Sequence, residues 1–487
     1  MGLVVGLDLG TQSLKAVVCD DRLVVLGDHA VDHPTQRPRP DHAEQDPAAW
    51  EAAIGPAIAG ALAAAGVKAD DIDALAIAGQ LDGCVAVDAA GAPLHPALIW
   101  QDRRAVDEVD RISGARLFAI AGQVADPGHM APKIRWLRRT NAARFHQPVS
   151  YLVERLTGAN VIDAALASTT MLLELATGGW SQSLLDAFDI TARELPEIEP
   201  TCSPAGTLGR RGAAITGLPS TTKVAVGTGD DFATPLGAGM VAPGPIVCAI
   251  GTAEVVGGLA ERAILDPAPE PMVETHAYPT GAYFVENPGW LSGGAVRWAV
   301  RMLGLASDAE LDRLAETAPP GADGVVFVPA LAGAMTPVWR PHARGTFHGL
   351  AAGHDRAHLA RAVLEGLAFA ARDVVERLAS IGLPARDVLV LGGGTRSAVW
   401  SQIRADVIGL PHQIAARTDT CAVGAAMIAA VCAGILPDLV TAAALAPPPR
   451  ARFDPHTRMD DAYGRYQRLV GQLAPLATTT WATDPVQ

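Results

Sequence analysis

The sequence has few aromatic residues, few lysines and no basic tract, and these shortages argue against a nucleic-acid-binding surface. Aromatic residues make up 5% of the 487 residues, and the formal net charge is −14. A surface that binds nucleic acid needs clustered basic side chains, and single strands are also held by aromatic stacking. We therefore expect an acidic protein that binds a small molecule and no nucleic acid.

Paired cysteines and long membrane-type segments are also missing. The six cysteines are scattered without a C-x-x-C pair, and several lie in apolar runs, where a free buried thiol is the usual state. The longest uncharged run, Phe232–Ala253, contains Pro235, Pro243 and Pro245, so it cannot be one continuous spanning helix. The first strand starts at once after Gly2, so we expect no signal peptide. These features predict a reduced, cytoplasmic protein with no membrane span.

Two common catalytic motifs do not occur. The chain has no G-x-x-x-x-G-K-[ST] loop and no G-x-S-x-G turn, which argues against a P-loop nucleotide site and against the nucleophile elbow of α/β-hydrolases. We expect surface or structural roles for the histidines and no zinc site built on them.

The most informative stretch that is present is the first one. Leu3–Val18 reads as two apolar strands joined by the polar turn Gly10-Thr11-Gln12-Ser13. Gly10 allows close approach of a ligand, and the Thr11 and Ser13 hydroxyls with nearby backbone N–H groups can cradle phosphate oxygens. Asp8 at the strand end can hold Mg²⁺, directly or through water. The alternative is an N-terminal hairpin with an ordinary polar turn.

A second copy of this hairpin favours the phosphate interpretation. Ile246–Val256 repeats the strand, the Gly251-Thr252 turn and the returning strand, with Ala249 in the place of Asp8. Two such hairpins half a chain apart indicate a duplicated fold with a nucleotide between the copies.

Polar residues also follow two other predicted strands. Ala74–Ala78 leads into Gly79-Gln80-Leu81-Asp82, and Ala97–Trp100 leads into Gln101-Asp102-Arg103. Ligands of α/β sheets gather at strand ends, so these residues are candidates for one polar pocket, with ordinary strand-end turns as the alternative. Residues from about 112 to 207 are expected to be mainly helical and to carry no chemistry.

Three later segments complete the candidate site. The strand Lys223–Gly227 leads to Asp230-Asp231, two adjacent carboxylates at a predicted helix start, where the helix dipole favours the ionised form. Ser292-Gly293-Gly294 opens a helix that carries Arg297. The strand Val388–Leu391 runs into the glycine loop Gly392-Gly393-Gly394-Thr395-Arg396-Ser397, which suits the flat ring of an adenosine.

These motifs, in this order, resemble the FGGY carbohydrate kinases, and within them the xylulokinase group. The resemblance covers nearly the whole chain. It rests on Gly6-Leu7-Asp8-Leu9-Gly10-Thr11, Ala78-Gly79-Gln80, Trp100-Gln101-Asp102-Arg103-Arg104, Gly229-Asp230, Gly251-Thr252, Thr336-Pro337, Gly349-Leu350 and Gly392-Gly393-Gly394-Thr395-Arg396-Ser397.

The resemblance implies an α/β fold of two actin-like (ribonuclease H-like) ATPase domains with the active site in the cleft between them. We expect an N-terminal sugar-binding domain over 1–243 and a C-terminal nucleotide-binding domain over 244–440, divided at Pro243-Gly244-Pro245. In the remaining segment, 441–487, we expect a helix over Asp460–Leu473 that packs back on the first domain. The family also implies a homodimer.

The resemblance further implies the substrates and the roles of residues. ATP and Mg²⁺ would be used, with Asp230 as catalytic base and Asp8 as a second catalytic acid near the phosphates and the metal. The acceptor would be a small sugar or polyol, phosphorylated on a terminal hydroxyl. The expected acceptor contacts are Gln80, Leu81, Asp82, Asp102, Arg103 and Asp231. The expected nucleotide contacts are Gly10, Thr11, Gln12, Ser13, Gly251, Thr252, Gly293, Arg297, Gly393, Gly394 and Ser397; Arg297 and Ser397 stand where glycerol kinases commonly have amide side chains.

D-Xylulose, giving D-xylulose 5-phosphate, is the leading acceptor, and D-ribulose, ribitol and xylitol are the alternatives. The alternatives matter because Leu81-Asp82 stands where xylulokinases commonly have Met-His, and Asp231 where Asn or Gln is frequent. A histidine can donate to a keto oxygen, whereas an ionised aspartate only accepts. We therefore hypothesise a shift toward another ketopentose or a pentitol. More remote alternatives are an actin-like ATPase clamp and a sugar sensor without kinase activity.

Overall fold

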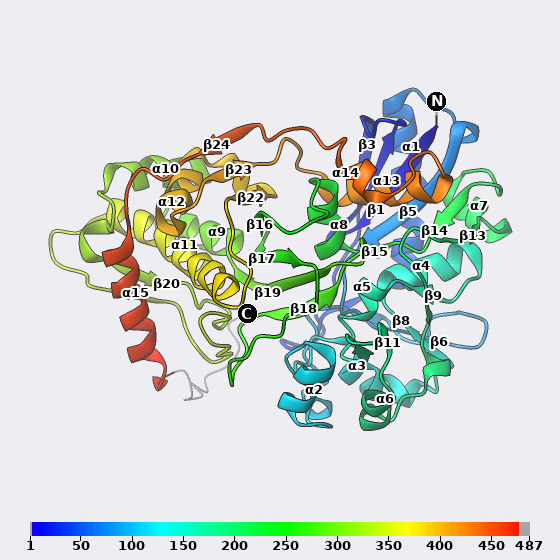
Figure 1. Ribbon diagram of the computed structural model, residues 1–487, viewed down its shortest axis with the longest axis horizontal. Coiled ribbons are helices and arrows are strands. Elements are labelled where there is room, and N and C mark those ends of the chain that lie inside the picture. The colour runs from blue at the N-terminus through cyan, green and yellow to red at the C-terminus, as the bar shows by residue number, and fades with distance from the viewer. Residues whose placement is uncertain (1, 477–487) are drawn as a thin grey trace.

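The computed structural model describes residues 2–476 and has two lobes, each built on a mixed β-sheet (Figure 1). In Figure 1 the blue, cyan and teal part of the chain, with the green α7 and the orange α13 and α14, forms the lobe on the right, and the lobe on the left contains the yellow α11 and the red α15. Each lobe contains one of the two predicted hairpins, as expected for a duplicated α/β fold.

The first lobe is organised on the predicted N-terminal hairpin. β1 (Leu3–Leu9) pairs antiparallel with β2 (Ser13–Cys19) and parallel with β5 (Ile72–Gly79). The sheet order is β13 (Pro204–Thr207), β14 (Lys223–Ala225), β5, β1, β2 and β3 (Val25–Asp32), with β15 (Thr228–Gly229) beside β5. β1 and β5 are nearly all buried apolar residues because both of their faces are covered.

Helix α1 (Pro47–Ala65) covers one face of this sheet. It starts at the predicted cap, where the Asp46 carboxylate accepts the Ala48 N–H at 2.9 Å, and ends at Gly66. By length and composition α1 could cross a membrane, but its Trp50 and Ile54 side chains are buried in the core shared with β1 and β2. A core helix passes the same test of length and composition, so α1 is weak evidence for a membrane span.

The second lobe repeats the hairpin. β16 (Ile246–Ile250) pairs antiparallel with β17 (Ala253–Ala260) and parallel with β22 (Val388–Leu391), as β1 pairs with β2 and β5. The sheet order is β18 (Glu274–Ala277), β19 (Tyr283–Leu291), β17, β16, β22, β23 (His412–Ile414) and β24 (Ala451–Phe453). The helices of this lobe are α9 (Gly293–Met302), α10 (Asp308–Thr317), α11 (Arg356–Ser380) and α12 (Ala398–Ile408), beside the short pair β20 (Val326–Val328) and β21 (Thr346–His348).

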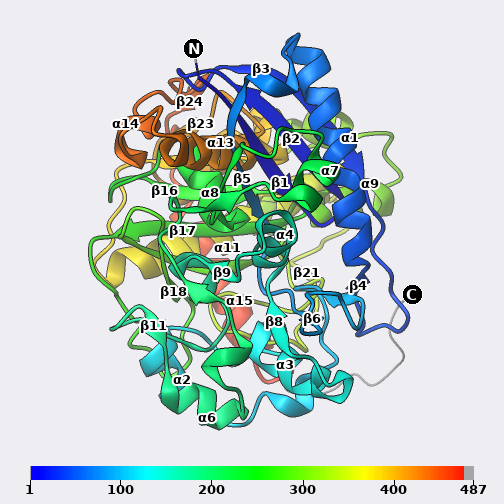
Figure 2. The same cartoon turned by 90° about the vertical axis from the view of Figure 1, so that its right-hand side faces the viewer.

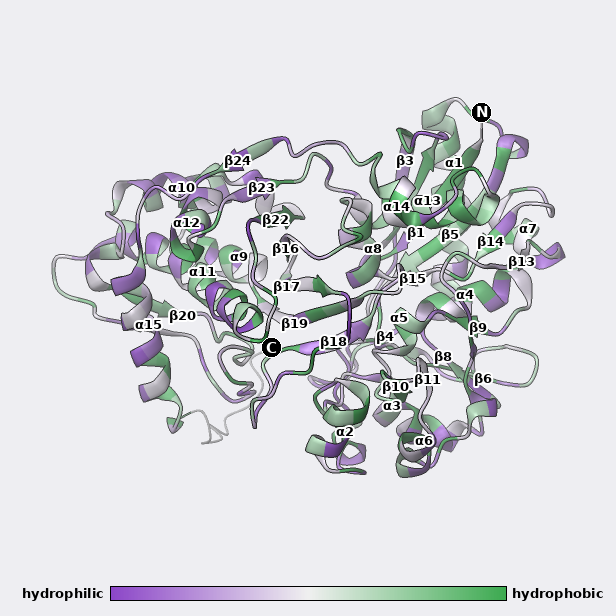
Figure 3. Ribbon diagram, in the orientation of Figure 1, coloured by the Kyte–Doolittle hydropathy of each residue, from purple (hydrophilic) through white to green (hydrophobic). Residues whose placement is uncertain are grey.

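The chain returns to the first lobe earlier than expected. Helix α13 (Thr420–Ala433) packs against β1, β5 and helix α8 (Asp230–Gly237), and the short α14 (Leu439–Ala443) follows it there (Figures 1 and 2). Nearly every residue of α13 is buried, because it lies between the first sheet and α8. Apolar residues dominate β1, β5 and α13, as the hydropathy colours indicate (Figure 3).

The expectation that the last helix packs on the first domain is wrong. Helix α15 (Asp460–Leu473) lies against α11 and β20 of the second lobe. It buries one apolar stripe, and its Tyr463 and Tyr466 contact Phe369 of α11 with ring centroids 5.9 and 5.3 Å apart. α15 is therefore part of the second lobe, and the returning element is α13.

The segment expected to be mainly helical is a mixed subdomain at the lower right of Figure 1. Its helices are α2 (Gly114–Ala121), α3 (Met130–Leu137), α4 (Pro148–Thr157), α5 (Ala164–Ala167) and α6 (Gln182–Phe188). Its short strands are β8 (Arg144–His146), β9 (Val161–Ile162), β10 (Leu173–Glu174), β11 (Gly179–Trp180) and β12 (Glu197–Ile198). Helix α7 (Arg210–Thr216), between β13 and β14, and the small pairs β4 (Glu44–Gln45) with β7 (Ala97–Leu98) and β6 (Val85–Val87) with β8 complete the first lobe.

Candidate active site

The turn of the first hairpin is tied to two other elements. The Gly10 N–H donates to the Ser13 carbonyl at 3.0 Å, which closes the turn. The Thr11 hydroxyl accepts from the Trp100 indole N–H at 3.0 Å, and the Thr11 carbonyl accepts from the Gln45 amide at 2.6 Å. Gln12 at the tip is exposed. Thr11 is thus held in place by Trp100 and Gln45, while Gln12 at the tip is exposed to solvent.

The turn of the second hairpin is closed in a similar way, with a hydrogen bond that spans one residue fewer. The Gly251 N–H donates to the Ala253 carbonyl at 2.8 Å, and the Arg297 guanidinium donates to the Thr252 hydroxyl at 3.0 Å. The start of α9 lies directly on this turn, since a Cβ on Gly293 would be 2.2 Å from the Gly251 carbonyl oxygen. Glycine is required at 293 because no side chain fits there. The structure therefore brings together Gly251, Thr252, Gly293 and Arg297.

The glycine loop after β22 lies beside the end of β16. Gly392 has φ +81°, and a Cβ there would be 2.5 Å from the Ile250 carbonyl oxygen. A Cβ on Gly394 would be 2.5 Å from the Ile250 side chain, whereas Gly393 between them is exposed. Ser397 caps α12, because its hydroxyl accepts the Trp400 N–H at 2.9 Å. Gly393 and Gly394 are thus close to the second hairpin, while Ser397 has a structural partner.

A buried ion pair links the second hairpin to α12. Glu254, two residues after Thr252, is paired with Arg404 of α12, and both side chains are almost completely buried. The Ser292 hydroxyl also donates to Glu254 at 2.7 Å. The Glu254 carboxylate on β17 therefore connects to both the start of α9 and α12.

Three carboxyl groups cluster between the first hairpin and α8. Burial raises the pKa of Asp8 to about 6, although Cys421 and Lys15 oppose the shift. Asp230 is the first residue of α8, and burial, together with Asp231 and Asp8, raises its pKa well above the usual value. Burial and the nearby Asp82 raise the pKa of Asp231 to about 7. Asp231 and Asp8 both raise the pKa of Asp230, so the three carboxyl groups form one cluster, and their catalytic roles stay predictions.

The donor set fits Mg²⁺ carried on a nucleotide. No group of three or more His, Cys, Asp or Glu side chains within residues 2–476 could hold a metal ion by itself. Mg²⁺ usually keeps several waters and takes one or two carboxylates plus phosphate oxygens, and Asp8 is a buried carboxyl group of the kind it takes.

Gln80 belongs to a buried amide network. Its Nε2 donates to Gln45 Oε1 at 2.8 Å, and the Trp50 indole donates to the same oxygen at 2.9 Å. Gln45 in turn holds the Thr11 carbonyl, so Gln80 is connected to the first hairpin turn. Leu81 lies near Gly229, where a Cβ would be 3.2 Å from the Leu81 side chain. Sequence reasoning missed Gln45, which is distant from Gln80 along the chain.

Asp82 has a left-handed backbone with φ +61°, a conformation that Asp tolerates better than most residues. Its N–H donates to Gln147 Oε1 at 2.9 Å, and its carbonyl accepts from Lys133 Nζ at 2.8 Å. Its carboxylate lies 3.1 Å from His129 Nδ1. Position 82 itself lacks the histidine donor that is common in xylulokinases. A histidine, His129 at the start of α3, nevertheless lies beside Asp82.

Asp102 and Arg103 have partners of their own. Asp102 is completely buried, accepts the Ala43 N–H at 2.7 Å and is paired with Arg104 at 2.7 Å. The Arg103 guanidinium makes two contacts with Asp126, at 2.7 and 2.5 Å. Both side chains are accounted for structurally, and their contact with an acceptor stays a prediction.

Several polar groups near Asp82 come from segments that the sequence reasoning did not single out. They are His129, Lys133, Gln147, Glu274, His276 and Glu286. Three of them, His129, Lys133 and Gln147, lie in the segment 112–207, and each contacts Asp82, which is itself predicted to contact the acceptor. A signal existed for β18, where charged residues in a sequence that reads as a buried strand are unusual.

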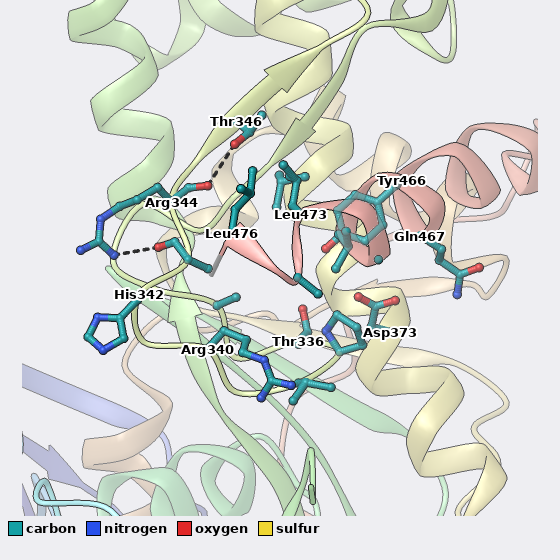
Figure 4. A pocket seen from close by; sticks show the side chains of 18 residues that line it. Thr336, Arg340, His342, Arg344, Thr346, Asp373, Tyr466, Gln467, Leu473 and Leu476 are labelled. Atoms are coloured by element: carbon teal, nitrogen blue, oxygen red, sulfur yellow. Dashed lines mark hydrogen bonds between the residues drawn. The ribbon is translucent and has the colours of Figure 1, made fainter. Parts of the chain in front are cut away.

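A separate cavity of about 540 Å³ lies in the second lobe, between α15, α11 and the loop over 334–346 (Figure 4). Val328, Leu473 and Leu476 contribute to its apolar wall, and Asp373 and Tyr466 line it too. None of the predicted site residues lines this cavity. It is distinct from the cluster around Asp230.

Family models match most of the chain. Residues 3–237 match the N-terminal domain of the FGGY family of carbohydrate kinases, and residues 246–433 match the C-terminal domain of that family.

Relatives of known name are similar over nearly their whole length. A xylulose kinase of Escherichia coli (strain K12) is 31% identical over 493 residues, which cover 97% of this chain and 100% of that protein. A xylulose kinase of Klebsiella pneumoniae is 32% identical over 418 residues, covering 84% of this chain and 85% of that protein. A glycerol kinase of Alkalilimnicola ehrlichii is 34% identical over 459 residues, covering 89% of this chain and 91% of that protein.

Solved structures agree in fold. A xylulose kinase from Rhodospirillum rubrum superposes with a TM-score of 0.89 at 30% identity, covering 98% of this chain and 100% of the other. A structure described as a xyloylose kinase from Brucella ovis gives a TM-score of 0.90 at 31% identity, covering 97% and 100%.

Proposed function

The chain belongs to the FGGY family of carbohydrate kinases, and from this premise we propose that it transfers the γ-phosphoryl group of ATP to a terminal hydroxyl of a five-carbon ketose. D-Xylulose, giving D-xylulose 5-phosphate, is the leading acceptor. The observation that carries the proposal is the cluster of Asp230 with Asp8 beside the first hairpin turn. The xylulose kinases among the relatives support the five-carbon acceptor.

Asp230 is the base in this proposal. Phosphoryl transfer needs little covalent help, so positioning and charge stabilisation carry most of the rate enhancement. The Asp230 carboxylate would accept the proton of the attacking hydroxyl, which contributes roughly 10²- to 10⁴-fold. Burial and the neighbouring carboxylates raise the pKa of Asp230, which makes its carboxylate a stronger proton acceptor.

The two hairpin turns and the glycine loop would hold the nucleotide. Backbone N–H groups of the turns at 10–13 and 251–252 are the donors proposed for the phosphates, and Arg297 adds a positive charge beside Thr252. The surfaces of Gly393 and Gly394 would accept the adenosine. Mg²⁺, when bound, neutralises phosphate charge, and Asp8 would hold it directly or through water.

Asp82 supports a second candidate, a kinase of another ketopentose or of a pentitol such as D-ribulose, ribitol or xylitol. The Asp82 carboxylate accepts hydrogen bonds from hydroxyl groups, which favours a polyol over a carbonyl at that position. Because glycerol kinases are also similar to the chain, a three-carbon acceptor belongs in the same test.

The test is ADP release from ATP and Mg²⁺ with each of D-xylulose, D-ribulose, xylitol, ribitol and glycerol. We expect the highest kcat/KM with D-xylulose and a loss of at least about 10²-fold in Asp230→Asn, which keeps the shape but removes the base. A pentitol or D-ribulose as best acceptor would replace the leading acceptor with the second candidate. ADP release that does not need an acceptor and persists in Asp230→Asn would instead indicate an ATPase clamp. No ADP release with any acceptor would indicate a sensor.

A further inference from the structure

The backbone of Asp82 is held more firmly than a surface turn requires. Gln147, which accepts the Asp82 N–H, is itself fixed by donating to the Leu166 carbonyl and the Thr169 hydroxyl, both at 2.9 Å. Lys133, which donates to the Asp82 carbonyl, is completely buried and also donates to the Ile99 carbonyl at 2.8 Å. A non-glycine residue in the left-handed region is strained, and such strain persists only where surrounding contacts hold it.

His129 connects this carboxylate to the other lobe. Its Nδ1 lies 3.1 Å from Asp82 Oδ1, and its Nε2 lies 3.7 Å from Glu274 Oε1. Asp82 and His129 belong to the first lobe, whereas Glu274 belongs to β18 of the second sheet. Glu274 is itself positioned, because its Oε1 accepts the Val124 N–H at 2.7 Å.

Two carboxylates and one amide donor surround the His129 ring. The donor is Gln123 Nε2, 3.3 Å from Nδ1, so Gln123 does not stabilise a proton on that nitrogen, and its Oε1 accepts the Met171 N–H at 2.6 Å. His276, from β18, lies beyond Glu274 at 3.8 Å from that carboxylate. Burial lowers the pKa of His276, so this second imidazole is neutral. Burial also opposes the charge on His129, but the carboxylates of Asp82 and Glu274 outweigh it and hold the pKa of His129 well above its usual value. Lys133 is the nearby cation, and it is directed at backbone carbonyls.

Unpaired buried polar atoms next to this group point to a ligand. Within residues 2–476, buried atoms without a hydrogen-bond partner include His276 Nδ1 and Glu286 Oε2, on two residues whose side chains lie 3.4 Å apart. Buried polar groups are normally paired, so a local concentration of unpaired ones needs an explanation. Burial and the carboxylates of Asp231, Glu274 and Asp82 raise the pKa of Glu286 well above its usual value, which places it in the same cluster as the proposed base. Hydroxyl groups of a polyhydroxylated acceptor would satisfy these atoms.

We propose that His129 is a positioning residue that binds Asp82 of the first lobe and Glu274 of the second at once, and so fixes the Asp82 carboxylate against the hydroxyl groups of the acceptor. The proposal deepens the proposed function and rests on it. It extends the acceptor site across both lobes, because Glu274 contributes from the second sheet. In this proposal Asp82 contacts the acceptor, while His129 and Glu274 act only by positioning the Asp82 carboxylate.

The kinetic test compares His129→Gln and Glu274→Gln with the wild type, using the best acceptor. We expect the KM for the acceptor to rise about 10- to 100-fold in both variants, because a charge-assisted contact that orients Asp82 is lost. The KM for ATP should not change. His358→Gln is the matched control, since His358 lies 2.8 Å from Asp355 and 3.2 Å from Asp323, also between two carboxylates, but at the start of α11.

A double variant separates positioning from direct contact. If His129 acts through Asp82, adding His129→Gln to Asp82→Asn should raise the acceptor KM no further than Asp82→Asn alone. Additive effects would show that His129 contacts the acceptor itself, and folded His129→Gln protein with an unchanged acceptor KM would overturn the proposal.

A second measurement does not depend on the acceptor. NMR of histidine labelled at Cε1 identifies the His129 signal by its loss in His129→Gln. We expect this ring to stay protonated at pH 7.5 in the wild type and to titrate at lower pH in Glu274→Gln. A neutral His129 ring at pH 7.5 in the wild type would overturn the proposal that His129 binds Asp82 and Glu274 at once, even if the kinase activity is found. If no acceptor raises ADP release, the proposed function fails, and the titration still decides whether His129 joins the two lobes.

Discussion

The contact between α8 and α13 predicts a large effect from the smallest substitution, Gly424→Ala. A Cβ on Gly424 would be 2.1 Å from the Ala233 carbonyl oxygen, and one on Gly237 would be 1.9 Å from the Thr420 carbonyl oxygen. Both obstacles are backbone atoms, so no side chain can rotate away. The two helices cross at this distance only because both positions are glycine.

The size of the effect follows from the distance. To reach even 3.0 Å, which real Cβ contacts seldom undercut, α8 and α13 must separate by about 0.9 Å. Overpacking of this kind costs about 1–3 kcal/mol or more, and the better helix propensity of alanine returns about 1 kcal/mol. Asp230 lies one turn from Ala233 on α8, and a displacement of this size at a reacting group lowers kcat by up to about 10²-fold.

Thermal denaturation and initial rates of ADP release measure the two effects. Gly471→Ala in α15 is the control, because nothing lies within 4 Å of a Cβ there, and it should leave kcat unchanged and raise the stability slightly. A Gly424→Ala enzyme with wild-type melting temperature and wild-type kcat would refute the reasoning.

Two other predictions follow from buried charges. Because the pKa of Asp231 is raised to about 7 and that of Asp230 lies well above its usual value, kcat/KM should fall as the pH decreases below about 7, where protonated carboxyl groups cannot accept the hydroxyl proton. Asp231→Asn removes one neighbouring charge and should move this decline to lower pH, whereas a flat profile between about pH 5 and 8 would contradict the assignment. Arg404→Met leaves Glu254 buried without its partner and should cost about 3–5 kcal/mol of stability, measured by denaturant unfolding. Adding Glu254→Gln should recover part of this loss, and an unchanged unfolding midpoint in Arg404→Met would show that the pair does not stabilise the fold.

Local patterns were sufficient to predict the hairpins and the helix start at Asp230. In each hairpin the strand, the turn and the returning strand are consecutive in sequence. In α8 the two acidic residues directly follow a strand, so in both cases neighbouring residues determine the local geometry. The FGGY resemblance then supplied the relation between the two halves, which spacing alone could not.

The acceptor side could not be predicted in the same way. Asp82, His129 and Glu274 come from three segments far apart in the chain, and only the folded structure shows that a histidine lies beside Asp82. The path of α13 was also hidden. Its sequence is apolar on all sides, which indicates burial between two layers but not which sheet provides one of them.

Because α13 lies on the first sheet although it follows the second in sequence, one cut of the chain cannot divide the molecule into its two lobes. A fragment that ends at Pro243 would leave Val4, Ala74 and Phe232, which belong to a core shared with α13, open to water. The complementary fragment would carry α13 as an apolar helix without its sheet. The two lobes therefore depend on each other to fold. The two fragments, if produced separately, should regain structure only when they are mixed.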